Sequence, residues 1–240
     1  MLFTPEMTGL LDRDSGRAAK VVRTEEEDQV LAAARQAAAR HRIWVHIGSL
    51  AVLVDNGKVA NRSFLIDREG NVRGTYDKLH LFDVDLPTGE TWRESNVYSA
   101  GAGVTLVNGT PVGKLGLTIC YDLRFPGLFA RLAEADADVI AVPAAFTVPT
   151  GKAHWHVLLR ARAIEAGLFV VAAAQVGHHE DGRNTFGHSL VVDPWGEILL
   201  DMAEEKGVGF AEIDLKRISD VRSRIPALNH RRPIPDAVTL

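Results

Sequence analysis

The residue type best suited to covalent chemistry occurs once in this sequence, at Cys120. It closes the apolar run 116–119 and is followed by a polar turn at 121–124. A thiol at the end of a buried strand, with a helix after it, faces the crevice in which α/β folds bind ligands, and the amino terminus of the helix can stabilise a thiolate. The alternative is a cysteine that packs as a small apolar side chain. The position of Cys120 therefore indicates a candidate nucleophile.

Two other stretches bring ionisable side chains to the ends of strand-like segments. Glu6 follows the short apolar start of the chain, and Lys78 ends a segment within residues 76–82. Taken singly, each is typical of a solvated surface residue. Taken with Cys120, they place a carboxylate, an ammonium group and a thiol at three strand ends, and this joint occurrence favours a common site.

This chain order of Glu6, Lys78 and Cys120 resembles the nitrilase (carbon–nitrogen hydrolase) superfamily. The similarity runs from residue 2 nearly to the end of the chain, so chance agreement does not explain it. It continues at 92–96, 143–146, 151–155, 159–165, 187–196 and 230–233.

The resemblance implies a role for each residue of the constellation. Cys120 would attack an amide carbonyl and form a thioester, while Glu6 takes the thiol proton and later gives it to the departing amine. Lys78 and the backbone N–H of Tyr121 would stabilise the oxyanion. Glu94, at the family's second glutamate, would orient the lysine or help to activate water.

Within the superfamily, the sequence is most similar to amidases that act on amides derived from 2-oxoglutarate. The resemblance assigns Arg124 to the substrate carboxylate, and a guanidinium suits that task because it binds a carboxylate in bidentate fashion. Phe146 and Thr150 match positions that line the acyl pocket. The alternative for Arg124 is an ordinary capping or pairing role at a helix start.

The expected reaction releases 2-oxoglutarate and cysteinylglycine from deaminated glutathione. The alternative substrate is α-ketoglutaramate, which would make the protein an ω-amidase.

Other chemistries fit the sequence less well. A Cys–His hydrolase that pairs Cys120 with His154 or His188 leaves the Glu6 and Lys78 stretches unexplained. The stretches 154–156 and 178–181 contain histidine pairs but no further ligands at suitable spacing, so we predict no metal. Residues 101–103 lack the third glycine and the following helix of a dinucleotide-binding motif. We therefore expect no cofactor.

The elements that must position these residues follow from the hydrophobic pattern. We predict helices at about 25–40, capped by Thr24, and at 125–135 and 154–166, with strands at 43–54, 59–66, 114–120, 139–144 and 168–176. Asp55-Asn56-Gly57 is a hairpin signal. The βαβα order after residue 114 favours helices over sheet faces, and hairpins within 43–76 and 189–214 add antiparallel pairs. A two-sheet sandwich with outer helices fits both signals, and the resemblance implies the α/β fold of the nitrilase type, an αββα sandwich.

The chain length and its start define the expected domain. At 240 residues with 46% hydrophobic content, the chain can bury a substantial core, so we predict one carbon–nitrogen hydrolase domain over 1–240. The sequence opens at what looks like the end of a strand, whereas members of the superfamily usually carry a strand and a helix before that point. We therefore expect an amino-terminally shortened domain. The alternative to an active enzyme is then a catalytically weak binding or interaction protein.

Charge and composition restrict the partners. There are 27 Lys and Arg against 31 Asp and Glu, a formal charge of −4, and the basic residues are scattered, so we predict no nucleic acid. A single cysteine forms no internal disulfide, no leader is visible, and the longest apolar stretch is far shorter than the ~20 residues of a spanning helix. We expect a cytoplasmic enzyme that acts on a small-molecule amide and does not contact a membrane. The resemblance implies a homodimer or higher homo-oligomer.

Overall fold

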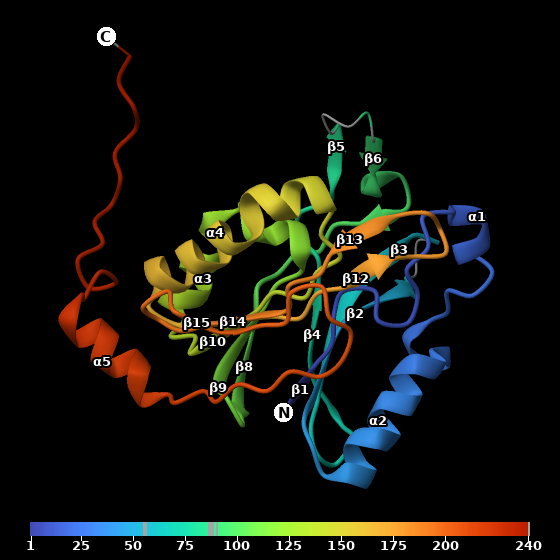
Figure 1. Ribbon diagram of the computed structural model, residues 1–240, viewed down its shortest axis with the longest axis horizontal. Helices are drawn as coiled ribbons and strands as arrows, with labels where there is room; N and C mark the ends of the chain where they lie inside the picture. Colours follow the sequence, from blue (N-terminus) through green and yellow to red (C-terminus); the bar gives the residue numbers. More distant parts are fainter. Residues whose placement is uncertain (55–56, 86–88, 90, 240) are drawn as a thin grey trace.

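The computed structural model describes residues 1–54, 57–85, 89 and 91–239. Two sheets stack against each other in the middle of the molecule, and helices cover their outer faces (Figure 1). The predicted αββα arrangement is thereby confirmed.

The first sheet carries the amino-terminal half of the site. Its strands are β1 (Leu2–Phe3), β2 (Val45–Leu53), β3 (Val59–Ile66), β4 (Val72–Asp77) and β7 (Tyr98–Ser99), in the order β1-β2-β3-β4 with β7 beside β3. Phe64 and Ile66 of β3 belong to the core beneath the helix α2, while Leu65 between them belongs to the core between the sheets. Because successive side chains of a strand point to opposite faces, β3 is buried on both sides.

The second sheet leads to Cys120. Its strands are β8 (Thr105–Thr110), β9 (Gly113–Leu117), β10 (Val139–Ala141), β11 (Phe169–Ala172), β14 (Leu190–Val192) and β15 (Ile198–Asp201), in the order β15-β14-β11-β10-β9-β8. The central strands β9, β10 and β11 are parallel. Two ribbons stand apart, β5 (Asp83–Asp85) with β6 (Thr91–Arg93) and β12 (Val176–His178) with β13 (Asn184–Phe186).

The helices follow local stop and start signals. They are α1 (Ser15–Ala18), α2 (Gln29–His41), α3 (Pro126–Glu134), α4 (Val148–Ala166) and α5 (Lys216–Arg224), with 3-10 turns η1 (Glu25–Glu27), η2 (Glu94–Asn96) and η3 (Cys120–Arg124). A proline lies near the start of both α3 and α4, where the N–H that proline lacks would have no acceptor within the helix. Gly167 ends α4 in the left-handed conformation. Helix α4 therefore begins earlier than predicted, at Val148.

The predicted cap of α2 was wrong. Asp28, not Thr24, caps the helix, since its carboxylate accepts a hydrogen bond of 2.8 Å from the backbone N–H of Leu31. Residues 25–27 form the separate turn η1, because the extended backbone of Asp28 interrupts the helical path between them and α2.

The carboxyl-terminal hairpin is shorter than predicted. β14 and β15 pair as expected, but residues 202–214 form no strand. Val208 is 67% exposed and Phe210 is 88% exposed, so this segment lies on the surface without a neighbouring strand among the described residues. In the first predicted hairpin, Asp55 and Asn56 lie outside the described part of the chain.

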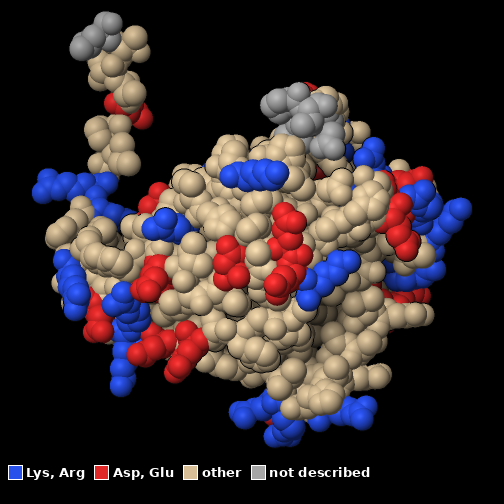
Figure 2. Space-filling view, viewed as in Figure 1, with Lys and Arg blue, Asp and Glu red and all other residues tan. Residues whose placement is uncertain are grey.

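Charges of both signs are mixed on one face of the molecule. On the face in Figure 2, blue and red side chains are interspersed and tan surface separates them. No helix among the described residues is long and apolar enough to cross a bilayer.

Candidate active site

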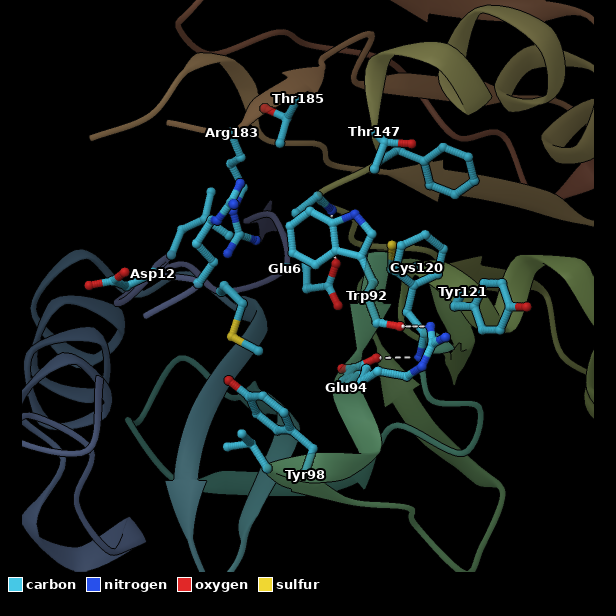
Figure 3. A pocket seen from close by; sticks show the side chains of 18 of the residues that line it. Glu6, Asp12, Trp92, Glu94, Tyr98, Cys120, Tyr121, Thr147, Arg183 and Thr185 are labelled. Atoms are coloured by element: carbon cyan, nitrogen blue, oxygen red, sulfur yellow. Dashed lines mark hydrogen bonds between the residues drawn. The ribbon is translucent and has the colours of Figure 1, made fainter. Parts of the chain in front are cut away.

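A cavity of about 740 Å³ opens between the ends of the two sheets. Glu6 follows β1, Lys78 follows β4 and Cys120 follows β9 after two residues, and all three line this cavity. Figure 3 shows Glu6 and Cys120 side by side in its middle, close to Trp92. Three residues that are far apart in the sequence thus meet because each stands at the end of a strand.

Lys78 is held between two carboxylates. Its Nζ lies 3.0 Å from Oε1 of Glu6 and 2.9 Å from Oε2 of Glu94. The side chain of Lys78 is 2% exposed and that of Glu6 is 6% exposed, so this ion pair is buried. Glu94 also accepts a hydrogen bond of 2.6 Å from the backbone N–H of Phe82, which fixes its carboxylate beside the lysine.

The side-chain amide of Asn61 donates hydrogen bonds to the same two glutamates. Its Nδ2 lies 2.9 Å from Oε1 of Glu6 and 3.2 Å from Oε1 of Glu94. The other oxygen of Glu6 accepts a hydrogen bond of 2.8 Å from the backbone N–H of Ala145, after β10. Glu6 is therefore oriented from both sheets.

The electrostatics keep Glu6 and Lys78 ionised. Burial by itself would raise the pKa of Glu6, but the Lys78 ammonium and hydrogen bonds from Cys120, Lys78 and Asn61 outweigh burial and lower that pKa. Burial would lower the pKa of Lys78, but Glu6 and Glu94 outweigh it, so the pKa of Lys78 lies well above its usual range. The site therefore holds a charged acceptor and a charged donor next to the thiol.

The backbone at Cys120 is bent sharply. Its φ is +48°, in the left-handed region that side chains other than glycine rarely adopt, and its N–H donates a hydrogen bond of 2.8 Å to the carbonyl of Pro143. The fully buried Asp122 braces the turn, since its Oδ2 accepts hydrogen bonds from the backbone N–H of Ile119 at 2.9 Å and the hydroxyl of Tyr76 at 2.7 Å. This bend presents the thiol to the cavity.

The thiol is protonated at rest. Burial raises the pKa of Cys120, the negative charge of Glu6 raises it further, and Lys78 only partly opposes them, so the pKa lies well above the usual value. Stabilisation of a free thiolate by the following helix, which the sequence suggested, is therefore outweighed. The Glu6 carboxylate, which lines the same cavity, can take the thiol proton as the sulfur attacks.

The residue after the thiol has a backbone N–H that is free within the described part of the chain. The backbone N–H of Tyr121 is in the first turn of η3 and has no backbone acceptor among the described residues. Free N–H groups of this kind are typical of a helix start. The N–H and the Lys78 ammonium are the groups of the site that can stabilise a negative oxygen.

The residues predicted for the acyl pocket do not all line the cavity. Phe146 and Thr150 do, and the Thr150 hydroxyl lies 2.7 Å from that of Thr147. Arg124 is not among the lining residues, and its guanidinium lies 5.4 Å from the ring centroid of Phe146 and 3.3 Å from Nδ1 of His154. Its role as the carboxylate anchor stays a prediction.

The two histidines that a Cys–His hydrolase would use do not contact the thiol. His154 accepts from Arg124, and Nδ1 of His188 lies 2.9 Å from Oδ1 of Asp201. His156, His188 and Asp201 do offer ligand-type atoms within 4.8 Å of one another, outside the cavity lining. The two rings hydrogen-bond to the Asp201 carboxylate, so the cluster connects α4 to β15.

Sequence reasoning missed Asn61, which contacts Glu6 and Glu94, and several residues that line the cavity. Asn61 is fully buried in β3, and a polar residue inside an apolar strand is the signal that could have found it. Arg13, Trp92 and Arg183 line the cavity. Trp92 lies in the stretch 92–96 that supports the resemblance, whereas nothing in the local sequence of Arg13 or Arg183 distinguishes them from surface residues.

Comparisons with known proteins agree with this geometry. A sequence model of the carbon-nitrogen hydrolase family matches residues 5–223. The chain is 42% identical over 207 residues to "Deaminated glutathione amidase" of Yersinia enterocolitica, which covers 85% of this chain and 72% of that protein. It is 44% identical over 195 residues to the protein of the same name in Mus musculus, with 80% and 60% covered.

Solved structures share the fold. The Caenorhabditis elegans NitFhit protein superposes with a TM-score of 0.88 at 38% identity, over 96% of this chain and 57% of that one. Nit3 of Saccharomyces cerevisiae, described as a member of branch 10 of the nitrilase superfamily, gives a TM-score of 0.82 at 29% identity, over 94% and 80%.

Proposed function

The chain belongs to the carbon–nitrogen hydrolase family, and we propose that it hydrolyses the amide bond of deaminated glutathione through a thioester on Cys120. The observation that carries the proposal is that Cys120, Glu6 and Lys78 line one cavity, where Nζ of Lys78 lies 3.0 Å from Oε1 of the buried Glu6 carboxylate. This arrangement supplies a nucleophile, a proton acceptor and an oxyanion donor in one cavity.

In the first half-reaction, Sγ of Cys120 attacks the amide carbonyl carbon while Glu6 takes the thiol proton. The carbonyl oxygen becomes an anion beside Nζ of Lys78 and the backbone N–H of Tyr121, donors of a kind worth about 3–4 kcal/mol each in an oxyanion hole. Glu6 then gives the proton to the leaving nitrogen. The C–N bond breaks, cysteinylglycine departs as an amine and the 2-oxoglutaryl group remains as a thioester.

In the second half-reaction, water replaces the amine. Glu6, again ionised, takes a proton from a water molecule that attacks the thioester carbonyl, and the same two donors stabilise the oxygen. The C–S bond breaks, Glu6 returns the proton to the Cys120 sulfur and 2-oxoglutarate leaves. Glu94 contacts Lys78 at 2.9 Å and supports this cycle by keeping the ammonium in place.

The substrate assignment rests on the names of the relatives together with the cavity. Several relatives at 42–48% identity carry the name deaminated glutathione amidase. The chain spans between 60 and 72% of the length of the first three of them. A volume of about 740 Å³ falls in the range, roughly 300–1,000 Å³, of pockets that bind molecules larger than a simple amide.

The test is the release of 2-oxoglutarate by the purified protein from deaminated glutathione and, separately, from α-ketoglutaramate. We expect a strong preference for deaminated glutathione that is lost in Cys120→Ala. Preference for α-ketoglutaramate would instead assign the ω-amidase reaction. Absence of Cys120-dependent turnover of either amide by folded protein would reject the proposal and favour a binding protein.

The proposal treats residues 1–240 as one catalytic domain that associates with a second copy. Val157 and Ile164 of α4 and the nearby Trp195 are large apolar side chains, each at least half exposed. Apolar side chains gathered on one surface are typical of an interface. Light scattering that gives the mass of a monomer at working concentration would contradict the association without affecting the assigned reaction.

A further inference from the structure

A second polar region of the cavity has no role in the reaction as derived above. It consists of Arg13, Trp92 and Arg183, which we call the outer subsite. The guanidinium carbon of Arg183 lies 5.0 Å from the centroid of the Trp92 ring, and that of Arg13 lies 5.9 Å from it. The guanidinium groups of Arg13 and Arg183, which are far apart in the sequence, thus both lie against the Trp92 ring in cation–π geometry.

The outer subsite has an excess of positive charge. Oδ2 of Asp181, whose side chain is 1% exposed, accepts from Nε of Arg183 at 2.6 Å and from the backbone N–H of Arg13 at 2.9 Å. Asp12, the other nearby acid, is paired with Arg17 at 2.8 Å. Within the described chain, no carboxylate lies within ion-pair distance of the Arg13 guanidinium, and the terminal nitrogens of Arg183 have no hydrogen-bond acceptor. The single buried carboxylate of Asp181 therefore does not neutralise the two guanidinium groups of the outer subsite.

Trp92 adds an unused donor. Its Nε1 is buried and has no hydrogen-bond partner among the described residues, although the side chain lines the cavity. Buried N–H groups in folded proteins almost always have an acceptor. An oxygen atom of a bound ligand would supply it.

The outer subsite lies on the leaving-group side of the nucleophile. In the view of Figure 3, Arg183 and Cys120 are drawn on opposite sides of the Trp92 indole, and Thr147, whose hydroxyl lies 2.7 Å from that of Thr150, is drawn on the side away from Arg183. Glu6 is drawn on the same side of Cys120 as Arg183. Because Glu6 gives its proton to the departing nitrogen, the departing group extends toward Arg183.

We propose that the outer subsite binds the terminal carboxylate of a peptide leaving group, an inference that rests on the proposed hydrolysis of a 2-oxoglutaryl peptide. Guanidinium groups bind a carboxylate with strong, directional hydrogen bonds, and here both arginines line the cavity. The Trp92 N–H donates to an oxygen of the same peptide. The subsite therefore selects amides whose leaving group is an anionic peptide over amides that release ammonia.

The experiment compares three substrates: deaminated glutathione, the same molecule with its terminal carboxylate converted to an amide, and α-ketoglutaramate. Arg13→Gln is the main variant, because its guanidinium has no protein carboxylate to leave unpaired. Trp92→Phe keeps the ring and removes the N–H. Arg68→Gln, at an exposed site outside the cavity lining, is the matched control.

We expect Arg13→Gln to lower the ratio of kcat/KM for deaminated glutathione to kcat/KM for α-ketoglutaramate by about tenfold, through KM, as the loss of a charged hydrogen bond predicts. The unmodified enzyme should prefer the acid to its terminal amide, and Arg13→Gln should reduce this preference. An equal loss on all three substrates, or equal use of acid and amide by the unmodified enzyme, overturns the proposal.

A binding measurement separates this inference from the proposed function. Calorimetry of Cys120→Ala with cysteinylglycine and with cysteinylglycinamide needs no turnover. Tighter binding of the free acid, lost in Cys120→Ala/Arg13→Gln, supports the subsite even if no amide is hydrolysed. Equal binding of the two peptides, or no binding of either, contradicts it.

Discussion

The side-chain amide of Asn61 lies 2.9 Å from Oε1 of Glu6, and both residues are buried. The same nitrogen lies 3.2 Å from Glu94, so one amide joins the two carboxylates that flank Lys78. A neutral donor at this point is important because the site already holds more carboxylates than ammonium groups. Asn61 therefore orients Glu6 without adding charge, as a positioning residue.

Asn61→Ala should lower kcat/KM because Glu6 loses a hydrogen bond of the charged kind, worth about 1.5–3 kcal/mol. This corresponds to about 10- to 100-fold in rate. Asn61→Asp should lower it further and move the acid limb of the pH profile to higher pH, since another carboxylate raises the pKa of Glu6. Steady-state kinetics across pH check both. Asn71→Ala, on a surface turn, is the control, and an unmoved acid limb in Asn61→Asp would contradict the role.

The pH dependence of the unmodified enzyme should be broad. Glu6 must be ionised to act as base, and its lowered pKa keeps it so until the pH falls below its usual value of 4.5. On the alkaline side, the pKa values of Cys120 and Lys78 lie well above their usual values of 9.0 and 10.5. We expect kcat/KM to be level from about pH 5 to about pH 9. A limb centred near neutral pH would show that another group controls the reaction.

The catalytic strand ends could be predicted from the sequence because each depends on local signals. Cys120 follows an apolar run, and Glu6 and Lys78 also follow strand-like segments, so the local pattern placed each of them at a strand end. Their selection as one site depended on the joint occurrence of the three motifs that the resemblance rests on. The resemblance to a known family supplied their expected roles, and the structure brings the three side chains to one cavity.

The remaining residues depend on long-range geometry that no local pattern carries. Arg13 and Arg183 lie around the same Trp92 ring, and Asp181 accepts hydrogen bonds from both segments, which their sequence separation hides. The prediction of where α2 starts was wrong for a simpler reason. Thr24 and Asp28 are both residue types that favour the N-cap position, and the sequence does not show which of them caps α2.

His46 should make the stability of the fold depend on pH. Its ring is buried between the strands, its Nε2 lies 2.8 Å from the Ser63 hydroxyl, and burial lowers its pKa to about 3. The unfolded chain takes up a proton near the usual value of 6.5 whereas the folded chain stays neutral, so the free energy of unfolding should fall as pH drops from 6.5 toward 3. At ~1.4 kcal/mol per pKa unit, this single group accounts for at most about 4–5 kcal/mol.

Urea unfolding at a series of pH values checks this, with His46→Gln as the variant. Glutamine can still hydrogen-bond to Ser63 but does not titrate, so the fall in unfolding free energy below pH 6.5 should be shallower than in the unmodified protein. His230→Gln, at an exposed site, should keep the original slope. Equal slopes in His46→Gln and the unmodified protein would assign the effect to other groups.

Gly48→Ala should impair catalysis through the backbone that carries Glu6. A Cβ at Gly48 would overlap the carbonyl oxygens of Thr4 and Pro5 and come within 2.5 Å of the Pro143 side chain. The segment that leads to Glu6 would therefore have to move, and a displacement of about 1 Å can cost ~100-fold in rate. Gly127→Ala, where an added Cβ meets nothing within 4 Å, is the matched control. We expect kcat to fall much more in Gly48→Ala than in Gly127→Ala while Gly48→Ala protein still shows cooperative thermal unfolding. Full activity in Gly48→Ala would mean that the position of Glu6 does not depend on this contact.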